Sequence, residues 1–175
     1  MAIKAIFLDR DGVINKEINY LHRIDDFQFI NGIFEACQFL ESLNYKIIVI
    51  TNQSGISHGY YTEIDFQKVT KWMLGQFHKN NIEILDVIHC PHLPSDYCDC
   101  RKPKPGMLLS AKSKYCIDME NSWMIGDKEE DIMAANAVNI KNTILVRSGH
   151  KINEKITKAK FVIDSIKESK FVINK

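Results

Sequence analysis

The chain has 175 residues, of which 45% are hydrophobic and 26% charged, and its formal net charge is +1 at pH 7. This length and composition predict a single globular domain, residues 1–175, with enough chain for a sizeable core. The small net charge gives no general attraction to nucleic acid or to an acidic membrane, and no apolar run approaches the length that crosses a bilayer.

Cysteine usage points to a reducing compartment. The chain has five cysteines, an odd number, and three of them cluster beside histidines, which favours metal binding over disulfides. The N-terminal residues run straight into the first predicted strand, so we expect no signal peptide and predict a cytoplasmic protein.

The first predicted element is a short buried strand that ends in two carboxylates. Residues 5–8 form an apolar run of strand length, and Asp9 and Asp11 follow before Gly12 permits a sharp turn. Side chains two residues apart in extended backbone point the same way, toward the crevice where open α/β sheets bind ligands. Two carboxylates this close favour a shared proton or a cation, and hard oxygen ligands suit Mg²⁺. A plain Asp-Gly turn with solvated carboxylates is the alternative.

Residues 13–31 are polar and aromatic without sustained periodicity, which predicts a loop over the active site. An amphipathic helix with a buried Cys37 is expected after Gly32. A β-branched run at residues 46–50 then predicts a second buried parallel strand. It ends in Thr51, which places a hydroxyl and nearby backbone amides at the same sheet edge, where they suit a phosphoryl oxygen. A strand-to-loop turn with a helix cap would explain the same residues.

A cysteine- and histidine-rich loop follows the next two predicted elements. Residues 62–65 form a capping box that starts a helix, and residues 84–89 predict a third strand. Three thiols and one imidazole then fall within eleven residues: Cys90, His92, Cys98 and Cys100. This set matches a closed structural zinc site, although its spacing is tighter than in common zinc fingers. A reduced, metal-free loop is the alternative.

Two basic residues, Arg101 and Lys102, come directly after this loop. A lysine offers a compact charge for a phosphoryl oxygen, and an arginine offers a planar fork for a second anion. A basic surface turn is the alternative. A helix is predicted over residues 106–115, with Cys116 buried at its end.

A fourth predicted strand, residues 122–127, ends in a carboxylate as the first strand does. Asp127 is therefore the natural third carboxylate for the magnesium. Asp131, four residues later, would either orient ligands or simply favour the start of a helix.

Residues 143–146 predict a fifth strand, residues 161–164 a short edge strand, and residues 165–170 a terminal helix. The alternation predicts an α/β fold, a Rossmann-like doubly wound parallel sheet flanked by helices. Walker-type, G-x-G-x-x-G and G-x-S-x-G motifs are missing from the sequence, which counts against nucleotide kinases, dinucleotide enzymes and serine hydrolases.

Four motifs in this order resemble the haloacid dehalogenase superfamily of phosphotransferases. They are Asp9-x-Asp11-Gly12, Thr51 after the second strand, Lys102, and Gly126-Asp127-x-x-x-Asp131. The resemblance covers about residues 4 to 150. The strand-end motifs and the Cys/His loop are similar to the small, capless histidinol-phosphate and heptose-bisphosphate phosphatases. Residues 101–107 and 126–131 most resemble the branch that removes the 7-phosphate of D-glycero-D-manno-heptose 1,7-bisphosphate.

The resemblance implies a magnesium-dependent phosphatase with a zinc-stapled loop. Asp9 would attack phosphorus to form an aspartyl-phosphate, and Asp11 would act as general acid and base. Thr51 and Lys102 would hold phosphoryl oxygens. The Mg²⁺ would be held by Asp9, Asp11 and Asp127, and the Zn²⁺ by the Cys90, His92, Cys98 and Cys100 side chains.

The resemblance also implies the residues that contact the sugar or its second phosphate. They are Arg10, Glu17, Ile18, Asn19, Tyr20, Asn52, Gln53, Ser54, Arg101 and Lys128. The expected ligand is a small phosphorylated sugar used in activated-heptose synthesis for surface polysaccharide. We expect a monomer without a nucleic-acid or membrane partner.

Two other functions stay open at this point. Histidinol phosphate is the first alternative substrate, because residues 93–97, between the two pairs of zinc ligands, form a short segment as in that branch. A zinc-stapled scaffold that binds partners without catalysis is the second, although every expected catalytic residue type is present.

Overall fold

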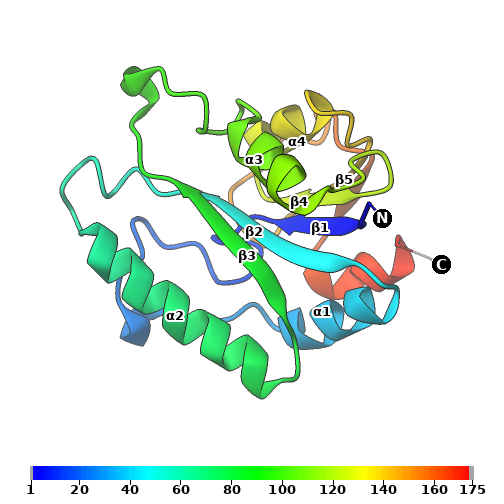
Figure 1. Cartoon of the computed structure of the whole chain (residues 1–175), viewed down its shortest axis with the longest axis horizontal. Helices are drawn as coiled ribbons and strands as arrows, with labels where there is room; N and C mark the ends of the chain where they lie inside the picture. Colours follow the sequence, from blue (N-terminus) through cyan, green and yellow to red (C-terminus); the bar gives the residue numbers. More distant parts are fainter. Residues whose placement is uncertain (1, 174–175) are drawn as a thin grey trace.

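Six parallel strands form one sheet in the order β3-β2-β1-β4-β5-β6 (Figure 1). The strands are β1 (Ala5–Leu8), β2 (Lys46–Asn52), β3 (Ile84–Cys90), β4 (Trp123–Gly126), β5 (Asn142–Val146) and β6 (Phe161–Ile163). The computed structural model describes residues 2–173; Met1 and residues 174–175, which the predicted domain includes, lie outside this range. The expected doubly wound parallel α/β sheet is confirmed.

Helices cover both faces of the sheet. On one face lie α1 (Ile33–Ser42), α2 (Glu63–Lys79) and the 3₁₀ helix η3 (Ile166–Phe171), and on the other lie α3 (Gly106–Tyr115) and α4 (Glu129–Asn136) (Figure 1). The sheet separates two clusters of buried hydrophobic side chains, and strand β1 contributes to both. Ile6 and Leu8 belong to one cluster, and Phe7 belongs to the other. Burial on both faces explains the uninterrupted apolar strands. None of the helices formed by residues 2–173 is long and apolar enough to cross a membrane.

The predicted capping box starts α2 as expected. Thr62 Oγ1 accepts from Asp65 N at 3.2 Å, and Asp65 Oδ2 accepts from Thr62 N at 2.9 Å. These bonds satisfy backbone donors that the first helical turn leaves free.

The prediction that Cys116 is buried at the end of its helix is wrong. Cys116 is exposed rather than buried, because it caps α3 in a left-handed conformation (φ 53°) and the chain turns so that Ile117 enters the core instead. The predicted terminal helix, residues 165–170, is present as the 3₁₀ helix η3, which packs against α1.

Residues 13–31 are only partly a loop over the active site. Val13 and Ile14 are fully buried in the core, and a short 3₁₀ helix, η1 (Ile24–Asp26), precedes the buried Phe27. Hydrogen bonds from Lys16 N to Gln28 O and from Ile30 N to Ile14 O, at 2.8 and 2.9 Å, tie the two arms together. Only the middle of the segment, around residues 17–21, is left to face the carboxyl edge of the sheet.

Candidate active site

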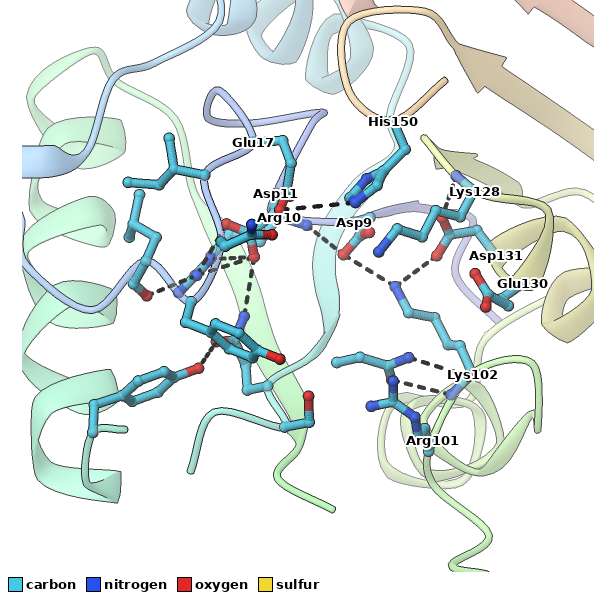
Figure 2. A pocket seen from close by; sticks show the side chains of 18 residues that line it. Asp9, Arg10, Asp11, Glu17, Arg101, Lys102, Lys128, Glu130, Asp131 and His150 are labelled. Atoms are coloured by element: carbon cyan, nitrogen blue, oxygen red, sulfur yellow. Dashed lines mark hydrogen bonds and ion pairs between the residues drawn. The ribbon is translucent and has the colours of Figure 1, made fainter. Parts of the chain in front are cut away.

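A cavity of about 240 Å³ opens at the carboxyl edge of the sheet (Figure 2). Most of the residues predicted from the sequence line it: Asp9, Arg10, Asp11, Glu17, Ile18, Asn19, Tyr20, Asn52, Gln53, Ser54, Arg101, Lys102 and Lys128. Asp131 also lines it. Sequence reasoning missed Leu21, Tyr61, Glu130 and His150.

Asp9 lies at the junction of β1 with the cavity, where the carboxylate is held through one oxygen. Oδ1 accepts from Arg10 N at 2.7 Å and lies 3.0 Å from Lys102 Nζ. Among the residues that the structure describes, none donates to Oδ2. Burial raises the pKa of Asp9 to about 6, against the opposing charge of Lys102. One carboxylate oxygen is therefore fixed and the other is available to a ligand.

Asp11 is held in the cavity wall. Both of its oxygens accept from the buried Arg10 guanidinium, at 3.0 and 3.1 Å, and further bonds come from Asn15 Nδ2 at 2.9 Å and Gln53 Nε2 at 3.1 Å. Strand β1 ends at Leu8, and Asp11 then forms an isolated bridge with Asn15. The hydrogen bonds hold the Asp11 carboxylate toward Arg10, and this carboxylate lies outside the group that Asp9 forms with Asp127.

Thr51 ends up beneath the cavity wall rather than on it. It is buried, and its hydroxyl accepts from Gln53 Nε2 at 2.8 Å. Tyr61 in turn donates its hydroxyl to Gln53 Oε1 at 2.6 Å, and burial raises the Tyr61 pKa to about 12, which keeps it a donor. Tyr61 therefore fixes which end of the Gln53 amide faces Asp11 and Thr51. Its position just before the capping box gave no signal of this role.

Lys102 is buried between two carboxylates, as the dashed lines in Figure 2 show. Its ammonium lies 3.0 Å from Asp9 Oδ1 and 2.6 Å from Asp131 Oδ1, and it donates to Ile50 O at 3.0 Å. Burial opposes the charge, but Asp131 and Asp9 outweigh it and raise the Lys102 pKa. The backbone of Lys102 exchanges two hydrogen bonds of 3.1 Å with the Asn52 amide, which ties this loop to the end of β2.

Three buried carboxylates form a group suited to a hard cation. Ligand atoms of Asp9, Asp127 and Asp131 lie within 4.8 Å of one another. Asp127 Oδ1 is buried without a hydrogen-bond partner among the described residues. Burial raises the pKa of both Asp127 and Asp131. When ionised, the three carboxylates carry more negative charge than the one ammonium of Lys102 can balance. Oxygen donors with surplus negative charge fit Mg²⁺ chemically.

His150 joins Asp127 to the cavity wall. Its Nδ1 lies 2.6 Å from Asp127 Oδ2, and its Nε2 lies 3.9 Å from Glu17 Oε1. Burial and the charge of Asp11 raise the Glu17 pKa to about 7. The one sequence signal for His150 was its place just after the fifth strand, at the edge where the other site residues lie.

The predicted zinc ligands come together beside this cavity. Ligand atoms of Cys90, His92, Cys98 and Cys100 lie within 4.8 Å of one another, and His92 Nδ1 is 3.2 Å from Cys100 Sγ and 3.5 Å from Cys90 Sγ. Three thiols and an imidazole at this spacing fit a Cys₃His zinc site. Arg101 Nη1 donates to His92 O at 3.2 Å, so the same loop supports a basic residue of the cavity.

The chain is similar to known proteins over most of its length. A family model described as HAD-hydrolase-like matches residues 99–169. The chain is 47% identical to D-glycero-beta-D-manno-heptose-1,7-bisphosphate 7-phosphatase of Vibrio cholerae serotype O1, over 96% of this chain and 95% of the relative. It is 49% identical to D-glycero-alpha-D-manno-heptose-1,7-bisphosphate 7-phosphatase of Campylobacter jejuni, over 86% and 87%.

A solved structure is similar over the same length. D,D-heptose 1.7-bisphosphate phosphatase from B. bronchiseptica, complexed with magnesium and phosphate, matches with a TM-score of 0.82 and 26% identity over 94% of each chain. The sequence identity to the curated relatives and the similarity of fold therefore point to the same family. The chain belongs to the D-glycero-D-manno-heptose-1,7-bisphosphate 7-phosphatase family of haloacid-dehalogenase-like hydrolases.

Proposed function

We propose that the chain is a magnesium-dependent phosphatase that removes the 7-phosphate of D-glycero-D-manno-heptose 1,7-bisphosphate in activated-heptose synthesis. The observation that carries this proposal is the free Oδ2 of Asp9 at a cavity that also holds Arg101, Lys102 and Lys128. Family membership supports the same substrate. We further propose that residues 1–175 act as one catalytic domain, in a cytoplasmic monomer.

The reaction proceeds through the Asp9 carboxylate. Oδ2 attacks phosphorus, so that a bond to Asp9 forms as the bond to the sugar oxygen breaks. Asp11 gives a proton to the leaving alkoxide and later takes one from the water that hydrolyses the aspartyl-phosphate. Lys102 holds a phosphoryl oxygen, and Thr51 contributes from beneath the cavity wall. Electrostatic positioning of this kind does most of the catalysis in phosphoryl transfer.

Two metals complete the proposed enzyme. Mg²⁺ would be held by Asp9 and Asp127, whose carboxylates lie in one group, whereas the carboxylate of Asp11, the third ligand predicted from the sequence, faces Arg10 instead. The bound ion would neutralise charge on a phosphoryl oxygen. Asp131 is better suited to holding Lys102, because its Oδ1 lies 2.6 Å from that ammonium. The Zn²⁺ ligands are Cys90, His92, Cys98 and Cys100, and the ion would be structural, stiffening the loop that carries Arg101.

The rest of the cavity suits a sugar with a second phosphate. Arg101 and Lys128 add positive charge to the cavity lining, and an arginine fork matches a phosphate. Tyr20 presents an aromatic wall, with its ring 4.7 Å from that of Tyr60. The remaining proposed sugar contacts are Arg10, Glu17, Ile18, Asn19, Asn52, Gln53 and Ser54.

Phosphate release from both anomers of heptose 1,7-bisphosphate and from histidinol phosphate, measured side by side with Mg²⁺, tests the proposal. Both anomers are needed because relatives of similar identity are named for different ones. We expect turnover of a heptose bisphosphate to exceed that of histidinol phosphate. The reverse order would move the enzyme to the histidinol-phosphate alternative, and no release from any of the three would favour the scaffold.

A variant separates recognition of the second phosphate from the chemistry. Arg101→Gln should raise KM for the bisphosphate more than it lowers kcat, by roughly 10-fold or more for one charge-assisted contact. Lys104→Gln, on an exposed neighbour, should leave KM unchanged. Equal effects of Arg101→Gln on the bisphosphate and on histidinol phosphate would contradict a role in binding a distal phosphate.

A further inference from the structure

The two oxygens of the Asp127 carboxylate have unequal surroundings. Oδ2 accepts two hydrogen bonds from one residue, from His150 N at 2.9 Å and from His150 Nδ1 at 2.6 Å. Oδ1 is buried and has no partner among the described residues. An unpaired buried acceptor is costly, so an oxygen left in this state is one that a ligand completes.

The loop that carries His150 is fixed against Asp127 by its backbone. Gly12 and Gly149 approach the Asp127 side chain so closely that a Cβ at either position would collide with it. Ser148 Oγ donates to Gly12 O at 2.7 Å, which joins the loop after β5 to the turn after β1. The direction from which His150 reaches Asp127 is therefore set by packed backbone.

His150 also spans the distance from Asp127 to the cavity wall. Its Nδ1 faces Asp127, which assigns the ring proton to that nitrogen, and its Nε2 faces Glu17 at 3.9 Å (Figure 2). The imidazole is about one-third exposed, whereas Asp127 is fully buried. His150 thus lies between the cavity and the Asp127 carboxylate, and it covers one side of that carboxylate.

We propose that His150 is a positioning residue for the catalytic cation: it holds Asp127 Oδ2 through two donors and so reserves Oδ1 for the metal. The inference rests on the proposed function in one respect, that Asp127 is a magnesium ligand. Hydrogen bonds to the far oxygen of a ligating carboxylate fix its orientation, and losing such a partner costs about 10–100-fold in metal affinity.

Binding of Mn²⁺ to the full-length protein, followed by the EPR signal of the free ion, tests this role without turnover. Mn²⁺ prefers oxygen ligands and so reports on the carboxylates rather than on the thiols. His150→Ala should weaken Mn²⁺ binding by about 10–100-fold. His150→Asn should recover most of the affinity, because its side-chain amide offers a donor near the position of Nδ1. Lys151→Ala, on the exposed next residue, should bind as the unmodified protein does.

The dependence of enzyme activity on Mg²⁺ concentration provides a second readout. If His150 acts through Asp127, His150→Ala should need more Mg²⁺ for half-maximal activity yet approach the unmodified kcat at saturating Mg²⁺. Thermal unfolding of each variant shows that the fold is retained, so a loss of affinity is not a loss of structure.

Three results would overturn the proposal. Mn²⁺ affinity of His150→Ala equal to that of the unmodified protein, with Asp127→Asn defective, would refute the role of His150 and leave the proposed function intact. Two bound Mn²⁺ ions per chain that fall to one in His150→Ala would make the histidine a ligand itself. Unchanged binding in Asp127→Asn would overturn the magnesium ligand set, and with it this role of His150.

Discussion

Lys102 and Asp131 form an ion pair of 2.6 Å in which both side chains are almost fully buried. The same ammonium lies 3.0 Å from Asp9, so Asp131 holds Lys102 beside the proposed nucleophile. Asp131 also accepts from Lys128 N at 3.1 Å through Oδ2, at the start of α4. The interpretation of Asp131 as an acid at a helix start is therefore confirmed, and a role in orienting ligands stays a prediction.

Asp131→Asn should destabilise the fold, because removing one partner of a buried pair leaves charge that the protein does not compensate. The usual cost is about 3–5 kcal/mol, and Asp9 remains as a second partner, so we expect the lower end. Urea unfolding measures it, with Glu120→Gln on the exposed surface as the control. A change below about 0.5 kcal/mol, typical of surface substitutions, would show that the pair contributes little.

Asp9→Asn should abolish turnover while the fold persists. An amide oxygen is a poor nucleophile. We therefore expect kcat to fall by more than about 1000-fold, as it does in other enzymes that lose a covalent nucleophile. Asp25→Asn, on a residue that is 85% exposed, provides a matched control. Circular dichroism confirms folding of both variants. Substantial activity of Asp9→Asn in a preparation free of other phosphatases would refute the nucleophile assignment.

The main site residues were predictable because strand ends determine where side chains go. Asp9 and Asp127 follow adjacent parallel strands, so their common edge follows from the order of elements alone. The cluster of three cysteines and one histidine was predictable for another reason, since four side chains suited to binding zinc lie in one short loop.

Residues that act through another side chain were not predictable. Tyr61 matters because it bonds Gln53, and His150 matters because it bonds Asp127, and neither pairing leaves a spacing signal. The orientation of the Asp11 carboxylate was not predictable either, because it depends on hydrogen bonds from the side chains of Arg10, Asn15 and Gln53. Exposure of Cys116 depends on a single left-handed residue, which composition does not reveal.

Tyr61→Phe should impair catalysis, although it leaves every charged residue of the cavity unchanged. Gln53 Oε1 would lose its 2.6 Å donor, and the amide could then turn away from Asp11 and Thr51. Leaving a buried acceptor unpaired costs about 1–3 kcal/mol, which corresponds to roughly 5- to 100-fold in kcat/KM if the cost falls on the transition state. Tyr60→Phe, on a more exposed ring, is the control. Equal kinetics of the two variants would argue against orientation of Gln53 by Tyr61.

Zinc should be present at one ion per chain, and Cys98→Ser should release it. Because Arg101 bonds to the carbonyl of His92 within the same loop, loss of zinc should raise KM for the bisphosphate and lower the melting temperature. Metal analysis by mass spectrometry and steady-state kinetics measure both effects. Cys116→Ser, on an exposed thiol outside the loop, should keep the zinc. Full zinc content in Cys98→Ser would contradict the ligand set.

Asp86 lies away from the active site, and we expect its carboxylate to make a pH-dependent contribution to the stability of the fold. Burial alone would raise the Asp86 pKa, but hydrogen bonds from Lys114, Tyr115 and Val87 outweigh it and hold the pKa below its usual value. The bonds from Lys114 Nζ and Tyr115 OH are both 2.9 Å. A carboxyl with a lowered pKa in the folded state stabilises the fold above its unfolded pKa, near 3.9, and loses this contribution as the pH falls through the folded value.

Asp86→Asn should therefore lower the free energy of unfolding by about 1 kcal/mol at pH 7, and the difference from the unmodified protein should shrink below about pH 4. Urea unfolding at pH 7, 5, 4 and 3 gives the comparison. Glu83→Gln removes a carboxylate that is 69% exposed and paired with Lys46 at 3.3 Å, so it should change stability by only a few tenths of a kcal/mol at every pH. A difference for Asp86→Asn that stays constant from pH 7 to 3 would mean that packing, rather than the charge of Asp86, carries the effect.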